Sequence, residues 1–231
     1  MPRSARALAR HLATGLAGLL YPALCLGCER RLAPDGPPAA LCASCLRALP
    51  RPEPGAALAL LDGAAVRAAA ALWAFDAGGA VQRVQHALKY GGQPGLGAPL
   101  GRLLGRALRD AGAGDVDLVV PVPLSGVRLL ERGYNQAAAL ADGVADDLGA
   151  PAADLLDRTR ATRRQATLAR PARVANVDGA FALRPGADVA GRRVLLVDDV
   201  LTTGATAAAA ARALAAGGAA VSVGALALAG A

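Results

Sequence analysis

The sequence contains no isoleucine, one lysine, two histidines and few aromatic residues, which make up only 3% of its 231 residues. Its 28 glycines and 15 prolines follow no triplet period, which excludes a collagen-like chain. We expect no membrane span. Hydrophobic residues nevertheless make up 54% of the chain and charged residues 19%, a composition that excludes general disorder. The chain is therefore predicted to be a folded globular protein with a substantial core.

The chain is basic, with 25 lysine and arginine residues against 18 acidic ones and a formal net charge of +7. Taken alone, this charge suggests a polyanionic partner. The scarcity of isoleucine, lysine and asparagine beside abundant alanine, arginine and glycine is, however, typical of a genome rich in G and C. Residues that resist this bias are correspondingly informative, and they include the neighbouring pairs Lys89-Tyr90 and Tyr134-Asn135.

The N-terminal segment carries three arginines ahead of a leucine-rich stretch from Leu12 to Leu20. A signal peptide would begin in a similar way, but two glycines interrupt this apolar stretch. The leucines of the segment recur at helical spacing, which favours an amphipathic helix over residues 1–21.

All four cysteines lie in two CxxC pairs separated by thirteen residues: Cys25, Cys28, Cys42 and Cys45. This spacing is typical of a tetrahedral zinc site, because each pair presents two thiolates to one ion. The alternative is two disulfides in an exported protein. We favour a closed, structural zinc site in a module over residues 22–50, which is too short for a core of its own. The proline-rich residues that follow predict a stiff linker over 51–63.

Apolar runs alternate with alanine- and leucine-rich stretches from residue 64 to residue 231, a pattern that indicates strand and helix units around a parallel sheet. The expected strands are Val66–Phe75, Leu118–Val122, Arg193–Val197 and Val221–Leu228, and the expected helices are Ala80–Tyr90, Leu96–Ala111, Asn135–Leu148 and Ala205–Ala216.

The sharpest motif follows the apolar strand that ends at Val197. Asp198 and Asp199 come next, and a turn then opens a helix with the residues Thr202, Thr203, Gly204, Ala205 and Thr206. A helix N-terminus with threonine hydroxyls favours a phosphate, while two adjacent carboxylates favour the hydroxyls of an attached sugar. An ordinary capped helix would account for one acid and one threonine only. The chain has no Gly-Lys-[Ser/Thr] sequence, which excludes a Walker A loop.

This motif resembles the phosphoribosyl-pyrophosphate (PRPP) motif of type I phosphoribosyltransferases, in which the acid pair holds the ribose hydroxyls and the turn holds the 5′-phosphate. Upstream lie a His-x-x-Lys-Tyr-Gly segment from His86, a Val-Pro-Val-Pro segment that ends at Pro123, and an Arg-Gly-Tyr-Asn-Gln segment from Arg132. Together with the double CxxC module, this order resembles the ComF family of competence-related proteins over nearly the whole chain.

The resemblance implies a type I phosphoribosyltransferase fold over 64–231, an α/β fold with a parallel sheet flanked by helices, and a small N-terminal zinc-ribbon module. It implies that Pro121–Gly133 is the pyrophosphate loop and that Lys89 and Arg132 are catalytic cations beside the catalytic acids Asp198 and Asp199. It also implies that Mg²⁺ binds with PRPP and that zinc is structural. The residues themselves leave other readings open: Lys89 as a helix-end lysine, Arg132 as a surface charge, and Tyr134 as a core residue.

Six arginines and no acid lie between Arg158 and Arg173. Such a run is usually a solvated loop. In type I phosphoribosyltransferases the corresponding segment closes over PRPP, and contact with a nucleic-acid backbone is a competing use of the same charges.

Two functional hypotheses follow. The first is a cytoplasmic enzyme that binds Mg²⁺ and PRPP and transfers ribose 5-phosphate to an acceptor that the sequence does not identify. The second is a non-catalytic accessory protein of DNA uptake that binds PRPP or single-stranded DNA and docks a partner such as a DNA-uptake helicase. The fold alone does not choose between them.

Overall fold

The computed structural model describes residues 23–32, 40–61, 63–90, 93–159 and 179–229. The chain divides into two compact units, Met1–Ala48 and Leu49–Ala231, which we describe separately. The expected N-terminal helix over 1–21 lies outside the described residues, as do five of the six clustered arginines: Arg160, Arg163, Arg164, Arg170 and Arg173. Within the described parts, no helix combines the length and the apolar character that crossing a bilayer requires.

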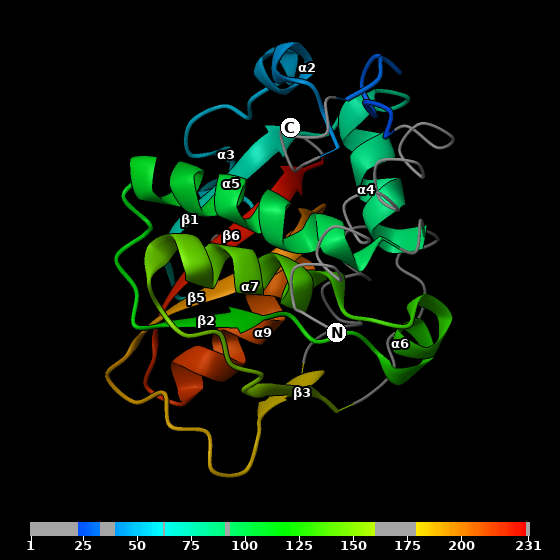
Figure 1. Ribbon diagram of the computed structural model, residues 1–231. Helices are drawn as coiled ribbons and strands as arrows, with labels where there is room; N and C mark the ends of the chain where they lie inside the picture. Colours follow the sequence, from blue (N-terminus) through cyan, green and yellow to red (C-terminus); the bar gives the residue numbers. More distant parts are fainter. Residues whose placement is uncertain (1–22, 33–39, 62, 91–92, 160–178, 230–231) are drawn as a thin grey trace, which may run out of the picture. The chain divides into compact units, whose positions relative to one another are not determined.

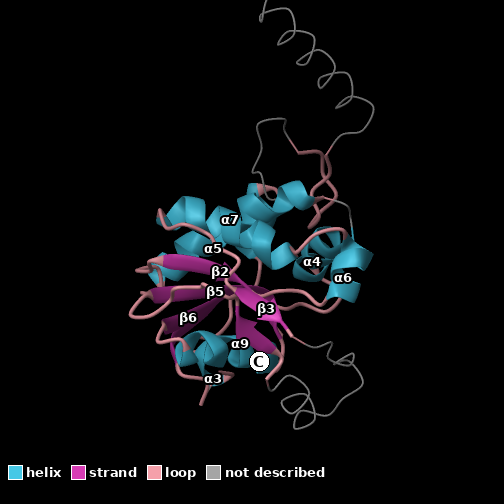
Figure 2. Cartoon of the chain, turned by 90° about the horizontal axis from the view of Figure 1, so that it is seen from below, coloured by secondary structure: helices cyan, strands magenta, loops and turns pink. Residues whose placement is uncertain are grey.

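The second unit is built on a four-stranded parallel sheet of β1 (Val66–Ala74), β2 (Leu118–Pro121), β5 (Arg193–Leu201) and β6 (Ala220–Leu228). The strand order is β1-β6-β5-β2, so every neighbouring pair requires a crossover connection. Figure 2 shows α5 (Gly97–Asp110) and α7 (Gln136–Leu148) on one face of the sheet and α9 (Ala205–Ala216) on the other. Coverage on both faces explains why residues 194–197 of β5 and the whole of β2 are buried and apolar. The predicted α/β fold is confirmed.

Two helices on one face of the sheet pack with their backbones in contact. A Cβ atom added at Gly101 of α5 would lie 2.1 Å from the carbonyl oxygen of Leu140, and one added at Gly143 of α7 would lie 2.0 Å from that of Ala98. Ion pairs such as Arg109–Asp147, at 2.8 Å, flank this contact. Glycine is therefore required at the crossing because no side chain fits between the helices.

The amino ends of the edge strand β2 and its neighbour β5 are joined by a charge cluster. The carboxylate of Asp117 accepts hydrogen bonds from the backbone N–H of Arg193 at 2.8 Å and from its guanidinium at 2.7 Å. Asp115 also pairs with Arg193. The hydrogen bonds from Arg193 lower the pKa of Asp117 to about 2.

Several shorter elements were not predicted from the sequence. They are α3 (Ala56–Ala59), α6 (Gly126–Arg132), a 3₁₀ turn (Pro94–Leu96), and an antiparallel ribbon of β3 (Leu156–Arg158) and β4 (Phe181–Leu183). The expected helix α4 (Ala80–Tyr90) is present. Residues 51–63, expected to be a linker, instead carry α3, and Ala57 and Leu61 are buried in the core of the second unit. Burial of these small and apolar side chains ties the segment to the sheet domain.

The first unit contains α2 (Ala43–Ala48) and a tight turn before it. An isolated bridge between Leu24 and Arg31 closes this turn, and the backbone N–H of Cys25 donates to the carbonyl of Arg30 at 2.8 Å. Glu29 adopts a φ of 60° inside the turn. The turn brings the first CxxC pair into a compact knuckle.

Candidate functional site

The parallel strands β2 and β5 end at the same edge of the sheet, and a cleft of about 390 Å³ opens there. The residues that line it belong to the end of α4, the β2–α6 loop, α6, β3, the end of β5, the turn that follows and the start of α9. Figure 1 shows where these elements lie in the fold. The residues that line it are Lys89, Tyr90, Val122, Pro123, Leu124, Arg128, Arg132, Arg158, Asp198, Asp199, Val200, Leu201, Thr202, Gly204, Ala205, Thr206 and Ala207. The structure thus brings together the four candidate catalytic residues from three separate segments of the sequence: Lys89, Arg132 and the adjacent pair Asp198 and Asp199.

The turn between β5 and α9 is held by Gly204. This residue caps α9 with a φ of 73°, and an added Cβ would lie 2.6 Å from the carbonyl oxygen of Leu60. Any other residue at this position would be strained, because the backbone is left-handed and because its side chain would meet the carbonyl oxygen of Leu60. The hydroxyl of Thr203 beside it is buried and has no hydrogen-bond partner in the described structure. The N-terminus of the twelve-residue helix α9 borders the cleft, and its dipole favours an anion there.

The two acids at the end of β5 have different partners. Asp199 pairs with Lys89, with 2.8 Å between the carboxylate oxygen and Nζ, and its carbonyl accepts a hydrogen bond from the side chain of Gln85 at 3.2 Å. Asp198 accepts a hydrogen bond from the backbone N–H of Asp199 at 2.8 Å. Burial, and then the charge of Asp199, raise the pKa of Asp198 above the usual range of a carboxyl group. One acid is thus matched by a cation, while the other favours its neutral form in the absence of a ligand.

Three arginines line the cleft: Arg128, Arg132 and Arg158. Arg132 donates to the side-chain oxygen of Gln136 at 2.9 Å, and its guanidinium lies 5.5 Å from the centroid of the Tyr90 ring. Arg158 lies 5.3 Å from the ring of Phe181, and burial followed by the charge of Arg128 lowers its pKa. The sequence predicted Arg158 at the start of a loop. It instead lies on β3, in the antiparallel ribbon with β4, and lines the cleft.

The turn between α6 and α7 is anchored by the Tyr134-Asn135 pair. The hydroxyl of Tyr134 donates to the carbonyl of Leu88 on α4. Asn135 donates to the carbonyl of Val122 at 3.1 Å and accepts from the N–H of Ala137 at 3.1 Å, which caps α7. These bonds join α4, the loop after β2 and α7, so the pair supports the walls of the cleft. Gln85 was missed by sequence reasoning, although its spacing of four residues before Lys89 places both on one helix face.

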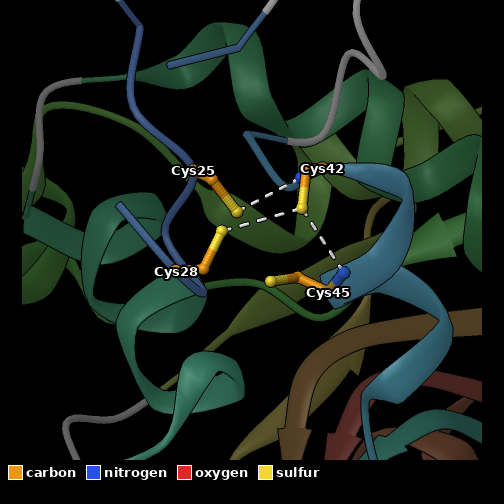
Figure 3. Close-up of side chains that lie close together, drawn as sticks. All are labelled: Cys25, Cys28, Cys42 and Cys45. Carbon is orange, nitrogen blue, oxygen red and sulfur yellow. Dashed lines mark hydrogen bonds between the residues drawn. The ribbon is translucent and has the colours of Figure 1, made fainter. Parts of the chain in front are cut away.

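The first unit contains the four-cysteine cluster (Figure 3). The sulfur atoms of Cys25, Cys28, Cys42 and Cys45 lie within 4.8 Å of one another, and those of Cys28 and Cys42 are 3.8 Å apart. Backbone N–H groups of Gly27 and Cys42 donate to the sulfur of Cys25 at 3.3 and 3.2 Å. The predicted cluster is therefore formed, and four cysteines so arranged could hold a metal ion.

The protonation of these cysteines depends on their mutual contacts. Burial alone would raise the pKa of Cys25, but the N–H donors, with that of Cys42 first, outweigh it and lower the pKa. The contact with Cys42 raises the pKa of Cys45. A Cβ atom added at Gly27 would lie 2.7 Å from the sulfur of Cys45, so the knuckle closes tightly around the sulfur atoms.

Comparisons with known proteins agree with this architecture. Residues 90–231 match the phosphoribosyl transferase domain family. Curated relatives include the DNA utilization protein YhgH of Salmonella typhi, 37% identical over 140 residues, which are 58% of this chain and 61% of the relative. They also include Competence protein F of Haemophilus influenzae, 36% identical over 124 residues, which are 51% of this chain and 54% of the relative. The chain thus spans between half and two thirds of the length of these relatives.

Among solved structures, a glutamine PRPP amidotransferase from B. subtilis aligns with a TM-score of 0.38 and 24% identity over 55% of this chain and 26% of its own. The matched domain covers more than half of the chain, and the relatives carry the names expected from the order of the motifs. The chain belongs to the phosphoribosyl transferase domain family and, within it, to the ComF-type proteins.

Proposed function

We propose that the second unit binds PRPP with Mg²⁺ and transfers ribose 5-phosphate to an acceptor, with release of pyrophosphate. One observation carries this proposal: an acid pair, a helix N-terminus rich in hydroxyls and several cations converge on a single cleft of about 390 Å³. Each group complements a different part of PRPP. The match to the phosphoribosyl transferase domain family supports the same assignment.

In this proposal the 5′-phosphate binds at the N-terminus of α9, where the turn contributes Thr202, Thr203, Gly204, Ala205 and Thr206. The helix dipole and the hydroxyls favour a dianion at this point. Asp198 and Asp199 accept hydrogen bonds from the ribose hydroxyls. Lys89 and Arg132 then stabilise the pyrophosphate, together with the segment from Pro121 to Gly133, which contains α6 rather than forming a single loop.

The transfer forms one bond to the anomeric carbon of the ribose and breaks another. The lone pair of the acceptor attacks this carbon, the bond to the pyrophosphate oxygen breaks, and pyrophosphate leaves with the bonding pair. The acceptor loses a proton to solvent. Arginine and lysine side chains stabilise the charge that develops on the leaving group. Mg²⁺ would bind with PRPP beside Asp198 and Asp199, and it would neutralise part of the same charge.

The first unit is proposed to bind one structural zinc ion through Cys25, Cys28, Cys42 and Cys45. Four sulfur atoms at the usual Zn–S distance of about 2.3 Å lie about 3.8 Å from each other, which is the separation of Cys28 and Cys42. No histidine or acid completes an open site among the described residues of the cluster. Reduced cysteines fit a cytoplasmic location.

Calorimetric titration with PRPP in the presence of Mg²⁺ tests the function. Asp198→Asn leaves the Lys89–Asp199 pair intact, and a second variant adds Asp199→Asn. Each lost charge-assisted hydrogen bond costs about 1.5–3 kcal/mol, so the double variant should bind at least about 100-fold more weakly. Asp146→Asn, which alters a surface pair with Arg102 outside the cleft, serves as the control. Wild-type affinity in the folded double variant would refute the site.

A second candidate is the non-catalytic accessory role, in which the cleft binds PRPP or single-stranded DNA without turnover and the protein docks a DNA-uptake helicase. It is favoured by the names of the relatives, which refer to DNA utilization and competence. Arg128 and Arg158 would then contact phosphates of the nucleic acid. Binding of PRPP without pyrophosphate release for any acceptor, together with salt-dependent DNA binding, would support this role.

A further inference from the structure

Gln136 is a buried polar residue at a position whose packing does not require a polar side chain. It is 1% exposed and, with Gln85, one of two polar residues buried in the part of the chain that the structure describes. It is the first residue of α7, and Asn135 already caps this helix by accepting from the backbone N–H of Ala137. Methionine has a similar unbranched shape and has no amide to desolvate. The amide of Gln136 therefore needs an explanation outside the packing of α7.

The two ends of this amide are used very differently. Its oxygen accepts a hydrogen bond from Nη1 of Arg132 at 2.9 Å, whereas its nitrogen is buried and meets no hydrogen-bond partner among the described residues. Exchanging the two atoms would set an N–H group against the guanidinium, which has donors only, so the oxygen must face Arg132. A buried N–H group without a partner destabilises a fold. The contact with Arg132 is thus made at a cost in stability.

Arg132 depends on side-chain contacts for its orientation, because the helix that carries it is little packed. It is the last residue of α6, and none of the seven residues of this helix is buried. Its guanidinium lines the cleft, with the Gln136 oxygen at 2.9 Å and the centroid of the Tyr90 ring at 5.5 Å. The hydrogen bond is the more directional of these two contacts. Gln136 therefore determines where the guanidinium points.

Gln136 holds this guanidinium without neutralising it. Among the described residues, no carboxylate pairs with Arg132, and Asp199 of the same cleft pairs with Lys89 instead. A glutamine oxygen is a neutral acceptor, whereas a glutamate at this position would form an ion pair with the arginine. The cleft thus keeps a cation that is fixed in direction and still carries its full charge, which suits an incoming anion.

We infer that Gln136 is a positioning residue that holds the Arg132 guanidinium in place for the pyrophosphate group of PRPP. This inference rests on the proposed PRPP site and adds to it a residue that does not itself line the cleft. Because the guanidinium is already oriented, it loses less side-chain freedom when the ligand binds. Gln136 thus favours binding at the expense of stability, a combination that a purely structural residue would not show.

The experiment compares the wild type with Gln136→Met, Gln136→Glu, Arg132→Met and the double variant that combines Gln136→Met with Arg132→Met. Calorimetry measures the Kd of PRPP with Mg²⁺, and the fluorescence of the single tryptophan, Trp73, gives the midpoint of urea unfolding. Gln82→Met is the matched control, because Gln82 is an exposed glutamine near the start of α4 and does not line the cleft.

Gln136→Met should raise the Kd of PRPP by about 3- to 12-fold, the cost of ordering one flexible side chain on binding, with a urea midpoint no lower than that of the wild type. Gln136→Glu should raise the Kd further, because its carboxylate competes with the ligand for the guanidinium. In the Arg132→Met background, Gln136→Met should change the Kd by less than about twofold, since the side chain that it orients is gone. Gln82→Met should leave the Kd unchanged.

Two results would overturn the inference while the proposed PRPP site stands. One is an unchanged Kd in Gln136→Met, which together with a lowered urea midpoint would make the residue purely structural. The other is an equal loss of affinity from Gln136→Met with and without the Arg132 side chain, because Gln136 would then not act through Arg132. Failure of the wild type to bind PRPP at all would instead refute the proposed function, and the inference would fall with it.

Discussion

Replacing Gly101 by alanine perturbs the contact between α5 and α7 by a single methyl group. The new Cβ would lie 2.1 Å from the carbonyl oxygen of Leu140 and 2.9 Å from the Cα of Gly143. Both neighbours are backbone atoms, so the helices must separate by about 1 Å to restore an ordinary contact. Overpacking of this kind costs typically about 1–3 kcal/mol, occasionally more, and the higher helix propensity of alanine returns nearly 1 kcal/mol. Because both neighbours are backbone atoms, the cost should lie in the upper part of this range, so we expect a net destabilisation of about 1–2 kcal/mol.

The matched control is Gly126→Ala, because Gly126 also lies in a helix and an added Cβ there meets no atom within 4 Å. This variant should be neutral or slightly more stable. Urea unfolding followed by the fluorescence of Trp73 measures the second unit specifically, since this buried residue of β1 is the only tryptophan in the chain. Equal stabilities of Gly101→Ala and the wild type would refute the proposed backbone contact between the helices.

Two further predictions concern metal and pH. The purified protein should carry one zinc ion per chain, and replacement of Cys28 and Cys42 by serine should abolish zinc binding because two of the four thiolates are lost. Metal analysis measures the zinc content. A folded wild type without zinc, or two disulfides under reducing conditions, would contradict the prediction. For Asp117, the hydrogen bonds from Arg193 lower the pKa from 3.8 to about 2. Their contribution to stability is therefore complete above about pH 5 and is lost as the pH falls toward 2. The difference in stability between the wild type and Asp117→Asn should narrow over that range in acid unfolding experiments, and a constant difference would contradict the pairing.

The main strands and helices could be predicted because each combines a clear apolar pattern with a clear end. The helix Ala80–Tyr90 agrees at both ends, and the helix after the threonine turn begins at Ala205 as expected. β5 extends four residues beyond its predicted end at Val197 and includes both acids, because its pairing with β6 continues to Leu201. The two acids had indicated that the strand ends before them, but pairing with the neighbouring strand β6 extends β5 through both acids.

The elements that were missed lack such patterns. The strands of the β3–β4 ribbon have three residues each and lie more than twenty residues apart in the chain, so no local signal joins them. The helix α6 buries none of its residues, and Val127 and Leu130 are more than half exposed, so it has no core-facing stripe that a sequence pattern could reveal. Arg158 and Arg128 reach the cleft from these two elements, which explains why sequence reasoning did not assign them to it.

The candidate site also extends beyond the segment that matches the domain family. That match begins at residue 90, yet Lys89 and Gln85 both contact Asp199, and the carbonyl of Leu88 accepts the hydrogen bond of Tyr134. All three lie on α4, whose last turn thus connects the acid pair to the turn between α6 and α7. A fragment that began at residue 90 would leave the carboxylate of Asp199 without its cation and remove β1 from the edge of the sheet. The residues before the matched segment therefore belong to the site itself, and the electrostatic balance of the cleft depends on them.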